Sequence, residues 1–155
     1  MIIERAETAD APEILALQKL AFLSEAQLYQ DYLIPPLTQT LEELVESFSR
    51  NVVLKAVEQG TIVGSVHGRL SKGRCPIGRL MVHPGQQGRG IGSRLMEAIE
   101  RSFPEAESYR LFTGEKSLGN IRLYERLGYR TYERKEVRGS FGIVFMEKKG
   151  RAGGE

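Results

Sequence analysis

The chain has one cysteine, no long apolar run and no internal repeat, and each absence removes a class of protein. The single thiol of Cys75 cannot form an internal disulfide, so a reducing cytoplasm is the simplest location. No apolar stretch approaches the ~20 residues of a membrane span, and residues 1–5 are not typical of a signal peptide. We therefore expect neither a membrane protein nor a disulfide scaffold. One globular domain should cover residues 1–149, with a disordered tail over 150–155.

The net charge is only +2, but the two signs are unevenly distributed. Residues 1–60 carry ten acidic and four basic side chains, which gives −6, whereas residues 61–155 carry ten acidic and eighteen basic ones, which gives +8. The basic part suits a ligand with several phosphates, and the acidic part suits a cationic substrate. Because the basic residues are interleaved with acidic ones, we expect no binding of nucleic acid.

Hydrophobic periodicity and turn residues predict an α/β fold with one mixed, mostly antiparallel sheet and flanking helices. Strands are expected over 2–6, 52–57, 61–70, 76–82, 109–113, 129–137 and 141–147, and helices over 10–22, 40–48, 91–103 and 118–127. A helix joins strands 76–82 and 109–113, which should therefore be parallel. Residues 23–37 are expected to be irregular. A capping box from Thr40 to Glu43 should begin one helix, and a turn at Gly139-Ser140 should join the last two strands.

The most informative stretch is residues 87–93, Gln-Gly-Arg-Gly-Ile-Gly-Ser, between a predicted strand and a predicted helix. Glycines at such a junction let N–H groups turn toward an anion, and the helix N-terminus adds unpaired donors and its dipole. A dinucleotide-binding fingerprint does not fit, because its third glycine would be Ser93 or Leu95. A P-loop does not fit either, because Gly90 is not followed by Lys and then Ser or Thr.

Two motifs together resemble the signatures of one family. The pattern Gln/Arg-x-x-Gly-x-Gly/Ala is met by Gln87, Gly90 and Gly92. Residues 120–129, Asn-Ile-Arg-Leu-Tyr-Glu-Arg-Leu-Gly-Tyr, follow about 30 residues later, which fits a helix, a strand and two loops. In both motifs and in their order the chain resembles the GCN5-related N-acetyltransferase (GNAT) superfamily.

The resemblance implies the acyl-CoA N-acyltransferase fold, whose sheet splays apart between the strand before the loop and the next parallel strand. In such enzymes acetyl-CoA, the acetyl donor, lies in that wedge, and its pantetheine pairs with the first of the two strands. No metal is expected. The cofactor-binding residues implied here are Leu80, Met81, Val82, Gln87, Gly88, Arg89, Gly90, Ile91, Gly92, Ser93 and Asn120.

The implied reaction is direct transfer of an acetyl group to a primary amine of a small molecule or a protein. By resemblance, Tyr124 is the acid that protonates the departing thiolate. No carboxylate stands on the strand before the loop, so Glu115 on the following strand is the first candidate for the base. His67 is the second candidate, and a chain of waters could serve instead. Direct transfer needs no nucleophile, so we do not expect an acyl-enzyme on Cys75.

In the family the first helices and the loop between them shape the acceptor pocket, which here means about residues 22–37. Tyr29 and Tyr32 are candidate walls, and Glu25 and Asp31 are candidate partners of a cationic amine. A small amine, an amino acid, an antibiotic and a protein amino group all stay open, as does assembly into a homodimer. The alternative function is a CoA- or acyl-CoA-binding regulatory domain that has kept the cofactor site and lost turnover.

Overall fold

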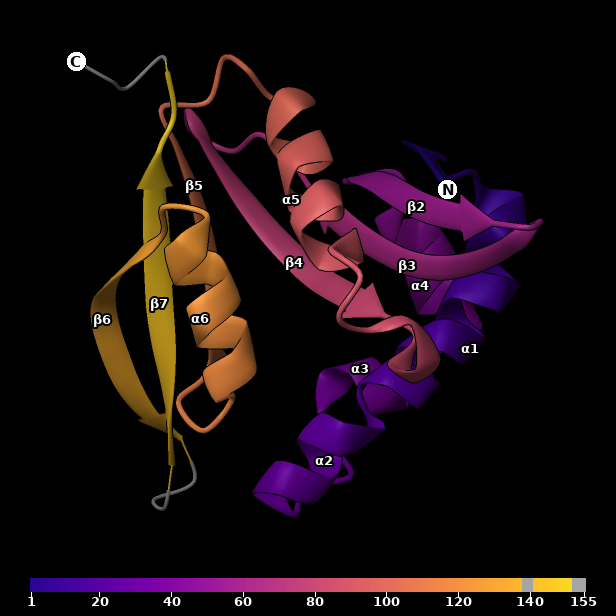
Figure 1. Ribbon diagram of the computed structural model, residues 1–155, viewed down its shortest axis with the longest axis horizontal. Helices are drawn as coiled ribbons and strands as arrows, with labels where there is room; N and C mark the ends of the chain where they lie inside the picture. Colours follow the sequence, from indigo (N-terminus) through magenta and orange to yellow (C-terminus); the bar gives the residue numbers. More distant parts are fainter. Residues whose placement is uncertain (138–140, 152–155) are drawn as a thin grey trace.

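The computed structural model describes residues 1–137 and 141–151 and contains one seven-stranded sheet (Figure 1). The strand order is β1-β2-β3-β4-β5-β7-β6, and neighbours pair antiparallel except β4 and β5, which are parallel. The strands are β1 (Ile2–Arg5), β2 (Val52–Glu58), β3 (Thr61–Gly68), β4 (Arg74–Val82), β5 (Ser108–Gly114), β6 (Arg130–Val137) and β7 (Phe141–Lys149). The predicted fold class and the predicted parallel pair are confirmed.

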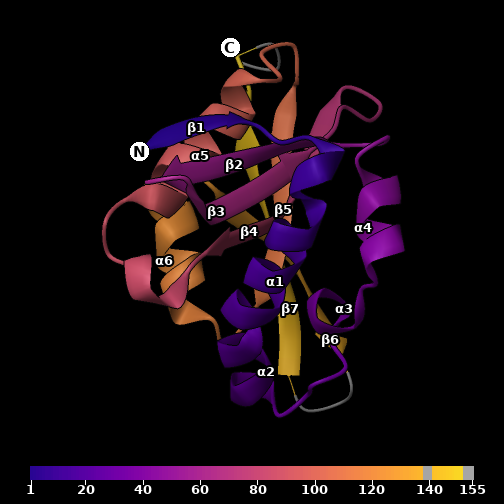
Figure 2. The same cartoon turned by 90° about the vertical axis from the view of Figure 1, so that its right-hand side faces the viewer.

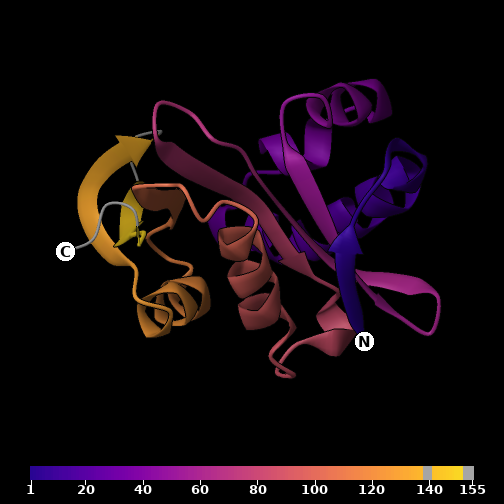
Figure 3. The same ribbon diagram turned by 90° about the horizontal axis from the view of Figure 1, so that it is seen from above.

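Helices cover both faces of this sheet, with α5 and α6 on one side and α1 to α4 on the other (Figure 3). The α-helices are α1 (Ala11–Ala21), α2 (Leu23–Tyr29), α3 (Pro35–Thr38), α4 (Leu41–Ser47), α5 (Ile91–Arg101) and α6 (Leu118–Arg126). Short 3₁₀ turns, η1 (Thr8–Asp10) and η2 (Pro84–Gln86), precede α1 and follow β4. Within the described ranges, no helix has the length and apolar character to cross a membrane.

Each face of the sheet has its own hydrophobic core. On one face, Leu95, Met96 and Ile99 of α5 are completely buried against strands β2 to β4. On the other face, Ile14 of α1 and Met81 of β4 belong to a separate cluster beneath α1 and α4 (Figure 2). Burial of the apolar side of α5 fixes this helix on the sheet, and with it the glycine loop that leads into the helix.

Strands β4 and β5 pair only over a short length in the part of the chain that the structure describes. The ladder consists of three pairs, Arg74–Ser108, Cys75–Tyr109 and Pro76–Arg110. Beyond these pairs the two strands diverge, as Figure 1 shows. The main chain of residues 77–82 therefore has β3 on one side and an open wedge on the other. This is the splay that the family resemblance implied.

One prediction about the fold was wrong, because residues 23–37 contain α2 and α3 instead of an irregular loop. The sequence hides α2 because Ala26 is its only buried residue, so the helix lacks an apolar stripe. Tertiary contacts hold it, including the Tyr29 ring, which packs on Phe141 with centroids 4.7 Å apart. Pro35 begins α3, at a position where a missing N–H costs nothing.

The capping box at the start of α4 is confirmed. The Glu43 N–H donates to the Thr40 hydroxyl at 3.1 Å, and the Thr40 N–H donates to the Glu43 carboxylate at 2.9 Å. The predicted turn at Gly139-Ser140 lies outside the described residues, as do residues 152–155 of the predicted tail. At the start of that tail, the Gly150 N–H donates to the Glu107 carbonyl oxygen at 2.8 Å.

Candidate active site

The glycine loop between β4 and α5 has a backbone that suits an anion. Gly88 and Gly90 both have φ of +79°, which residues with a Cβ atom rarely adopt. Gly90 is the N-cap of α5, and a Cβ atom built on either glycine would meet nothing within 4 Å. The loop therefore leaves open space at the N-terminus of an eleven-residue helix, where unpaired N–H groups and the helix dipole stabilise negative charge.

A cavity of about 360 Å³, here called the loop cavity, opens beside these glycines. Ten of the eleven predicted cofactor-binding residues line it: Leu80, Met81, Val82, Gln87, Gly88, Gly90, Ile91, Gly92, Ser93 and Asn120. Residues from the end of α1, from α2 and from α6 complete the wall. The fold thus brings together residues up to 40 positions apart, while their role in binding a cofactor stays a prediction.

The eleventh residue, Arg89, does not line the loop cavity. Its Nη1 and Nη2 atoms donate to the two carboxylate oxygens of Glu58 at 2.7 and 2.8 Å, and it also contacts Gln86. Arg126 of α6 lines the cavity instead, and we did not predict it. The sequence carried no clear signal for it, because the predicted residue of this helix, Asn120, is six positions away and does not share the helical face of Arg126.

A second cavity of about 330 Å³, here called the wedge cavity, lies where β4 and β5 diverge. Phe22, Glu25, Leu80 and Asn120 line both this cavity and the loop cavity. The two spaces are therefore neighbours that share a wall. Tyr124 of α6 lines the wedge cavity, so the loop and the predicted acid face adjoining spaces.

The Tyr124 side chain is 7% exposed, and its hydroxyl forms no hydrogen bond to any residue in the described ranges. Burial, and then the negative charge of Glu25, raise the pKa of Tyr124 well above the usual range of a phenol. The hydroxyl is consequently protonated at neutral pH and free to donate. Asn120 is fixed nearby, with its Nδ2 atom 3.4 Å from the Thr113 hydroxyl.

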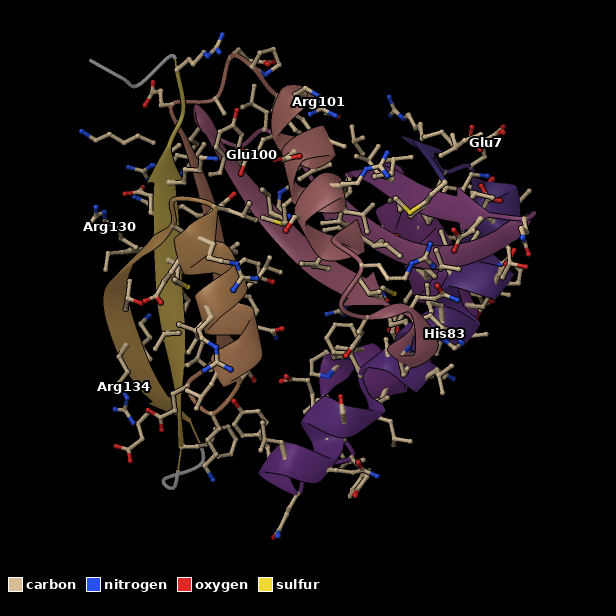
Figure 4. All side chains as sticks on the ribbon, in the orientation of Figure 1. Glu7, His83, Glu100, Arg101, Arg130 and Arg134 are labelled. Carbon is tan, nitrogen blue, oxygen red and sulfur yellow. The ribbon has the colours of Figure 1, made fainter. Side chains whose placement is uncertain are left out.

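The contacts of Glu115 argue against the role of base that we predicted for it. Its carboxylate accepts hydrogen bonds from Arg134 at 2.7 and 3.0 Å and from the Gly142 N–H at 2.6 Å. The Arg134 guanidinium, on the outer strand β6 in Figure 4, is the main cause that lowers the pKa of Glu115. Glu115 also lines neither the loop cavity nor the wedge cavity.

Two other buried groups have pKa values that count against catalytic use. His67 lines the wedge cavity, but burial and the charges of Arg79, Arg69 and Arg50 lower its pKa to about 4, which makes it a weak base. Cys75 is completely buried, and its burial raises the pKa of the thiol to about 12. The thiol is therefore a poor nucleophile at neutral pH.

Helix α2 is docked on the loop before α6 by a small polar cluster. The Ser117 hydroxyl donates to both Glu25 carboxylate oxygens, at 2.8 and 3.0 Å, and lies 2.9 Å from the Tyr29 hydroxyl. The Tyr29 hydroxyl also accepts from the Lys116 N–H at 2.9 Å. A Cβ atom on Gly114 would overlap that hydroxyl, so this close approach requires glycine.

Of the four acceptor-pocket candidates, the structure brings two to the cavities and leaves two outside. Glu25 and Tyr29 line the wedge cavity. Tyr32 is 55% exposed and lines neither cavity. Asp31 accepts a hydrogen bond from the Leu33 N–H at 3.0 Å and likewise lines neither.

The match to a family model follows this geometry. Residues 13–129 match the model of the Acetyltransferase (GNAT) family, a range that includes the glycine loop, the wedge and α6. The chain belongs to the GNAT acetyltransferase family. The predicted family is therefore confirmed, and the two cavities are those of a GNAT protein.

Solved structures agree with this GNAT assignment. The PaiA N-acetyltransferase of Thermoplasma acidophilum, in complex with coenzyme A, superimposes with a TM-score of 0.75 at 18% identity, covering 96% of this chain and 99% of that one. The yncA structure from Salmonella typhimurium, with acetyl-CoA, gives a TM-score of 0.75 at 20% identity, covering 96% and 92%. These likenesses confirm the fold, and their ligands agree with acetyl-CoA as the expected acetyl donor.

A curated relative is considerably longer than this GNAT chain. The UPF0157 protein YqkA of Bacillus subtilis (strain 168) is 26% identical over 131 residues. The match covers 84% of this chain but only 38% of YqkA. The chain thus spans well under half the length of that relative.

Proposed function

We propose that this GNAT chain is an acetyl-CoA-dependent N-acetyltransferase that transfers an acetyl group directly to a primary amine. The observation that carries the proposal is the shared wall of the two cavities, with the glycine loop on one side and Tyr124 on the other. A donor held at the loop and an amine held in the wedge would meet at that wall, which removes much of the entropic cost of bringing two reactants together. The buried thiol of Cys75 supports direct transfer. A reducing cytoplasm stays the proposed location because the chain has one cysteine.

The donor side uses mainly main-chain groups. The amides around Gly88 and Gly90 and the N-terminus of α5 would hold the pyrophosphate, with Arg126 as the nearest added cation. The unpaired edge of residues 77–82 would hold the pantetheine in the manner of an added strand. Neither interaction depends on a particular side chain in β4.

The acceptor amine must lose a proton before it can attack, because an alkylammonium has a pKa of ~10.4. We propose Glu25, in place of Glu115, as the group that contacts this amine and receives its proton directly or through water. Glu25 lines both cavities, and the Ser117 hydroxyl holds both of its carboxylate oxygens. Its position at the shared wall is the support for this role.

Attack of the free amine on the acetyl carbonyl forms a C–N bond and a tetrahedral oxyanion, which N–H groups of β4 near Met81 and Val82 would stabilise. Collapse of the tetrahedral species breaks the C–S bond. The Tyr124 hydroxyl would then give its proton to the leaving thiolate. The first amine proton ends on Glu25 or water, and the Tyr124 proton ends on sulfur. The nitrogen, which is positively charged after the attack, loses a second proton as the amide forms, and this proton returns to the Tyr124 phenolate directly or through water, so charge and protons balance.

The test is release of free thiol from acetyl-CoA with a panel of primary amines, comparing wild type with Tyr124→Phe. Loss of the hydroxyl should lower turnover on the order of 10²-fold, the usual size of the effect of a positioned acid. The ring remains to pack on Tyr129, so acetyl-CoA affinity and thermal stability should stay close to those of wild type. Tyr132→Phe is the matched control, since Tyr132 lies on the outer strand β6 and is 44% exposed.

Two results would contradict the proposal in different ways. Equal turnover of Tyr124→Phe and wild type would show that the thiolate leaves without this acid. Tight binding of acetyl-CoA with no thiol release across the panel would favour the alternative, a CoA-binding regulatory domain.

A further inference from the structure

Arg79 has an unusual backbone conformation in the middle of strand β4. Its φ is +54°, and the other described non-glycine residues with positive φ lie at a helix end or in turns: Gln30, Gln59 and Lys72. The β3–β4 ladder shifts register here, because Ser65 pairs with Met81 whereas His67 pairs with Gly78. A left-handed non-glycine residue costs free energy and persists where the surrounding structure requires it.

The Arg79 guanidinium has no partner in the described part of the chain. It forms no ion pair there, and its Nε atom is buried without a hydrogen bond. Burial alone lowers the pKa of Arg79, with no carboxylate acting in the opposite direction. The residue as a whole is half-buried, and a partly buried charge without a counter-ion is costly, which points to a binding role for this side chain.

Arg79 lines a third cavity of about 260 Å³, here called the polar cavity, as well as the wedge cavity. Among the described residues, three side-chain polar atoms are buried without a hydrogen-bond partner: Gln18 Oε1, Asn51 Oδ1 and Arg79 Nε. All three residues line the polar cavity. Buried orphan atoms are rare in folded proteins, so three around one space indicate a site that takes a polar group.

The other polar atoms of this site are fixed by the fold. Gln18 is completely buried, and its Nε2 atom donates to the Pro36 carbonyl oxygen at 3.0 Å and to Gln39 at 2.9 Å. The Asn51 Nδ2 atom donates to the Ser47 carbonyl oxygen at 3.2 Å. These bonds orient the free amide oxygens, so the lining is held in place before any ligand arrives.

The charge of the polar cavity is positive. Among the residues that the structure describes, its lining includes Arg50, Arg69 and Arg79 but no Asp or Glu. Arg50 is paired with Glu46, whereas Arg79 is not paired within residues 1–137 and 141–151. His67 adds no charge at neutral pH, because its pKa is lowered to about 4. An anion is the complement of the guanidinium groups, whereas the two free amide oxygens, of Gln18 and Asn51, would accept hydrogen bonds from N–H or O–H groups of the ligand or from water.

A more open hollow outside the polar cavity is acidic, and Arg79 lines it too. Its carboxylates belong to α4: Glu42, Glu43 and Glu46. Glu43 is engaged in the helix cap and Glu46 in the pair with Arg50. Glu42 is exposed and forms no ion pair with Arg79 in the described part of the chain, so this acidic hollow does not neutralise the Arg79 charge.

We propose that the amine acceptor also carries a carboxylate, and that Arg79 binds this carboxylate at the junction of the wedge cavity and the polar cavity. The inference rests on the proposed acetyl transfer for its amine end, which would lie toward Glu25 and Tyr124. A guanidinium binds a carboxylate through a planar pair of N–H donors, which gives orientation as well as affinity. The acceptor is thus an amino-carboxylic acid, either free or at the end of a peptide.

This inference selects the amino acid or peptide among the acceptors left open above, and it departs from the expectation of a cationic substrate that rested on the −6 charge of residues 1–60. Tertiary contacts use many of those acidic side chains. Asp10 pairs with Lys55 at 2.9 Å, Glu58 pairs with Arg89, and the Glu13 carboxylate accepts from the Ile62 N–H. They are consequently poor evidence for a free cation site.

The test measures thiol release with straight-chain ω-amino acids from glycine to 6-aminohexanoate, each paired with the alkylamine of the same length. In wild type, kcat/KM for the best acid should exceed that for its alkylamine by roughly tenfold or more, as expected for a hydrogen-bonded charge. Arg79→Gln should bring this ratio close to one, chiefly through KM for the acid. Arg79→Gly is a second variant, because glycine adopts the same φ without strain. Arg79→Lys should recover part of the ratio.

Arg130→Gln is the matched control, because Arg130 is exposed on the outer strand β6 (Figure 4). It should leave the ratio of wild type unchanged. Dipeptides are tested in the same assay. A higher kcat/KM for dipeptides than for free amino acids would show that the carboxylate bound by Arg79 is the C-terminus of a peptide. A wild-type ratio of one or below, or an unchanged ratio in both Arg79→Gln and Arg79→Gly, would overturn the inference.

A binding arm separates this inference from the proposed function. The same ω-amino acids should raise the melting temperature of wild type in the presence of CoA, and should not raise that of Arg79→Gly. This result would support the carboxylate site even if no amine were acetylated. Stabilisation of both proteins to the same extent, or of neither, would contradict it.

Discussion

The loop cavity and the polar cavity are built from different parts of the polypeptide. The loop cavity takes most of its lining from residues 80–93, and the features that suit phosphate are main-chain amides, glycine conformations and a helix N-terminus. The polar cavity takes side chains from α1, α4, β2, β3, β4 and the loops beside them. Its polar groups without a fixed partner or with a positive charge are two amides and three guanidinium groups. A site made of main chain can be shared by a family with varied sequences, whereas a site made of side chains can differ in each member.

The two cavities also differ in their energetic cost. The glycine loop reaches its conformation without strain and keeps its amides open to the cavity. The polar cavity holds three orphan polar atoms, a left-handed arginine and a buried histidine. Such costs are typical of sites where binding outweighs stability. The predictions below test this difference, from the largest expected effect to the smallest.

The largest effect concerns the stability of the folded protein and involves His67, which lines both the wedge cavity and the polar cavity. The pKa of His67 is about 4 in the folded protein, against an ordinary 6.5, so the unfolded chain binds the proton more readily. The free energy of unfolding should therefore fall as pH is lowered from about 6.5 to about 4, with His67 accounting for about 3 kcal/mol. Urea titrations of wild type and His67→Gln across this range measure it. Parallel pH profiles for the two proteins would contradict the burial of an uncharged histidine.

The second prediction compares Glu25, the proposed base, with Glu115, the base that the sequence favoured. Glu25→Gln should lower turnover on the order of 10²-fold at neutral pH, and the loss should shrink as pH rises and the amine loses its proton unaided. Glu115→Gln is the matched control and should change turnover less than about twofold, because this carboxylate is paired with Arg134 on the protein surface. A large loss in Glu115→Gln with none in Glu25→Gln would restore Glu115 as the base.

On the donor side, Gly90→Val tests the main-chain site. Valine would place a β-branched side chain in the open space beside α5 and would strain a φ of +79°. Acetyl-CoA affinity measured by calorimetry should fall more than about tenfold, a loss of about 1.4 kcal/mol or more in binding free energy. Ser102→Val, at the other end of the helix, serves as a folding control. Equal affinities of Gly90→Val and wild type would remove the phosphate-loop interpretation.

The smallest effect is expected for the charged side chain of the same loop. Arg89 is exposed and its guanidinium is bound by Glu58, so Arg89→Ala should weaken acetyl-CoA binding less than about threefold. Arg126→Ala should weaken it more, since Arg126 lines the loop cavity. Both affinities are measured at one fixed ionic strength. A larger loss of acetyl-CoA affinity in Arg89→Ala than in Arg126→Ala would mean that Arg89 leaves Glu58 and binds the ligand.

The sequence by itself determined the family, the mixed sheet and most of the lining of the loop cavity. Those features depend on local rules: glycines at a strand-to-helix junction, helical periodicity in α5 and the ten-residue motif of α6. Ten of the eleven predicted donor contacts line the loop cavity because they depend on main chain from a few neighbouring segments. Arg89 is the predicted residue that does not line the loop cavity, because Glu58, 31 residues earlier, binds its guanidinium.

Only the tertiary structure decided which residues line the wedge cavity and the polar cavity. Helix α2 has no apolar stripe, and its place depends on Tyr29 and Glu25 reaching residues about 90 positions away in the sequence. Glu115 and His67 look alike as bases in the sequence, yet Arg134 pairs with one and burial lowers the pKa of the other. The sequence offers Arg69 and Arg79 equally as contacts of an acidic amine, and only the register shift between β3 and β4 distinguishes Arg79. Burial and charge pairing are properties of the packed chain, and local sequence rules do not contain them.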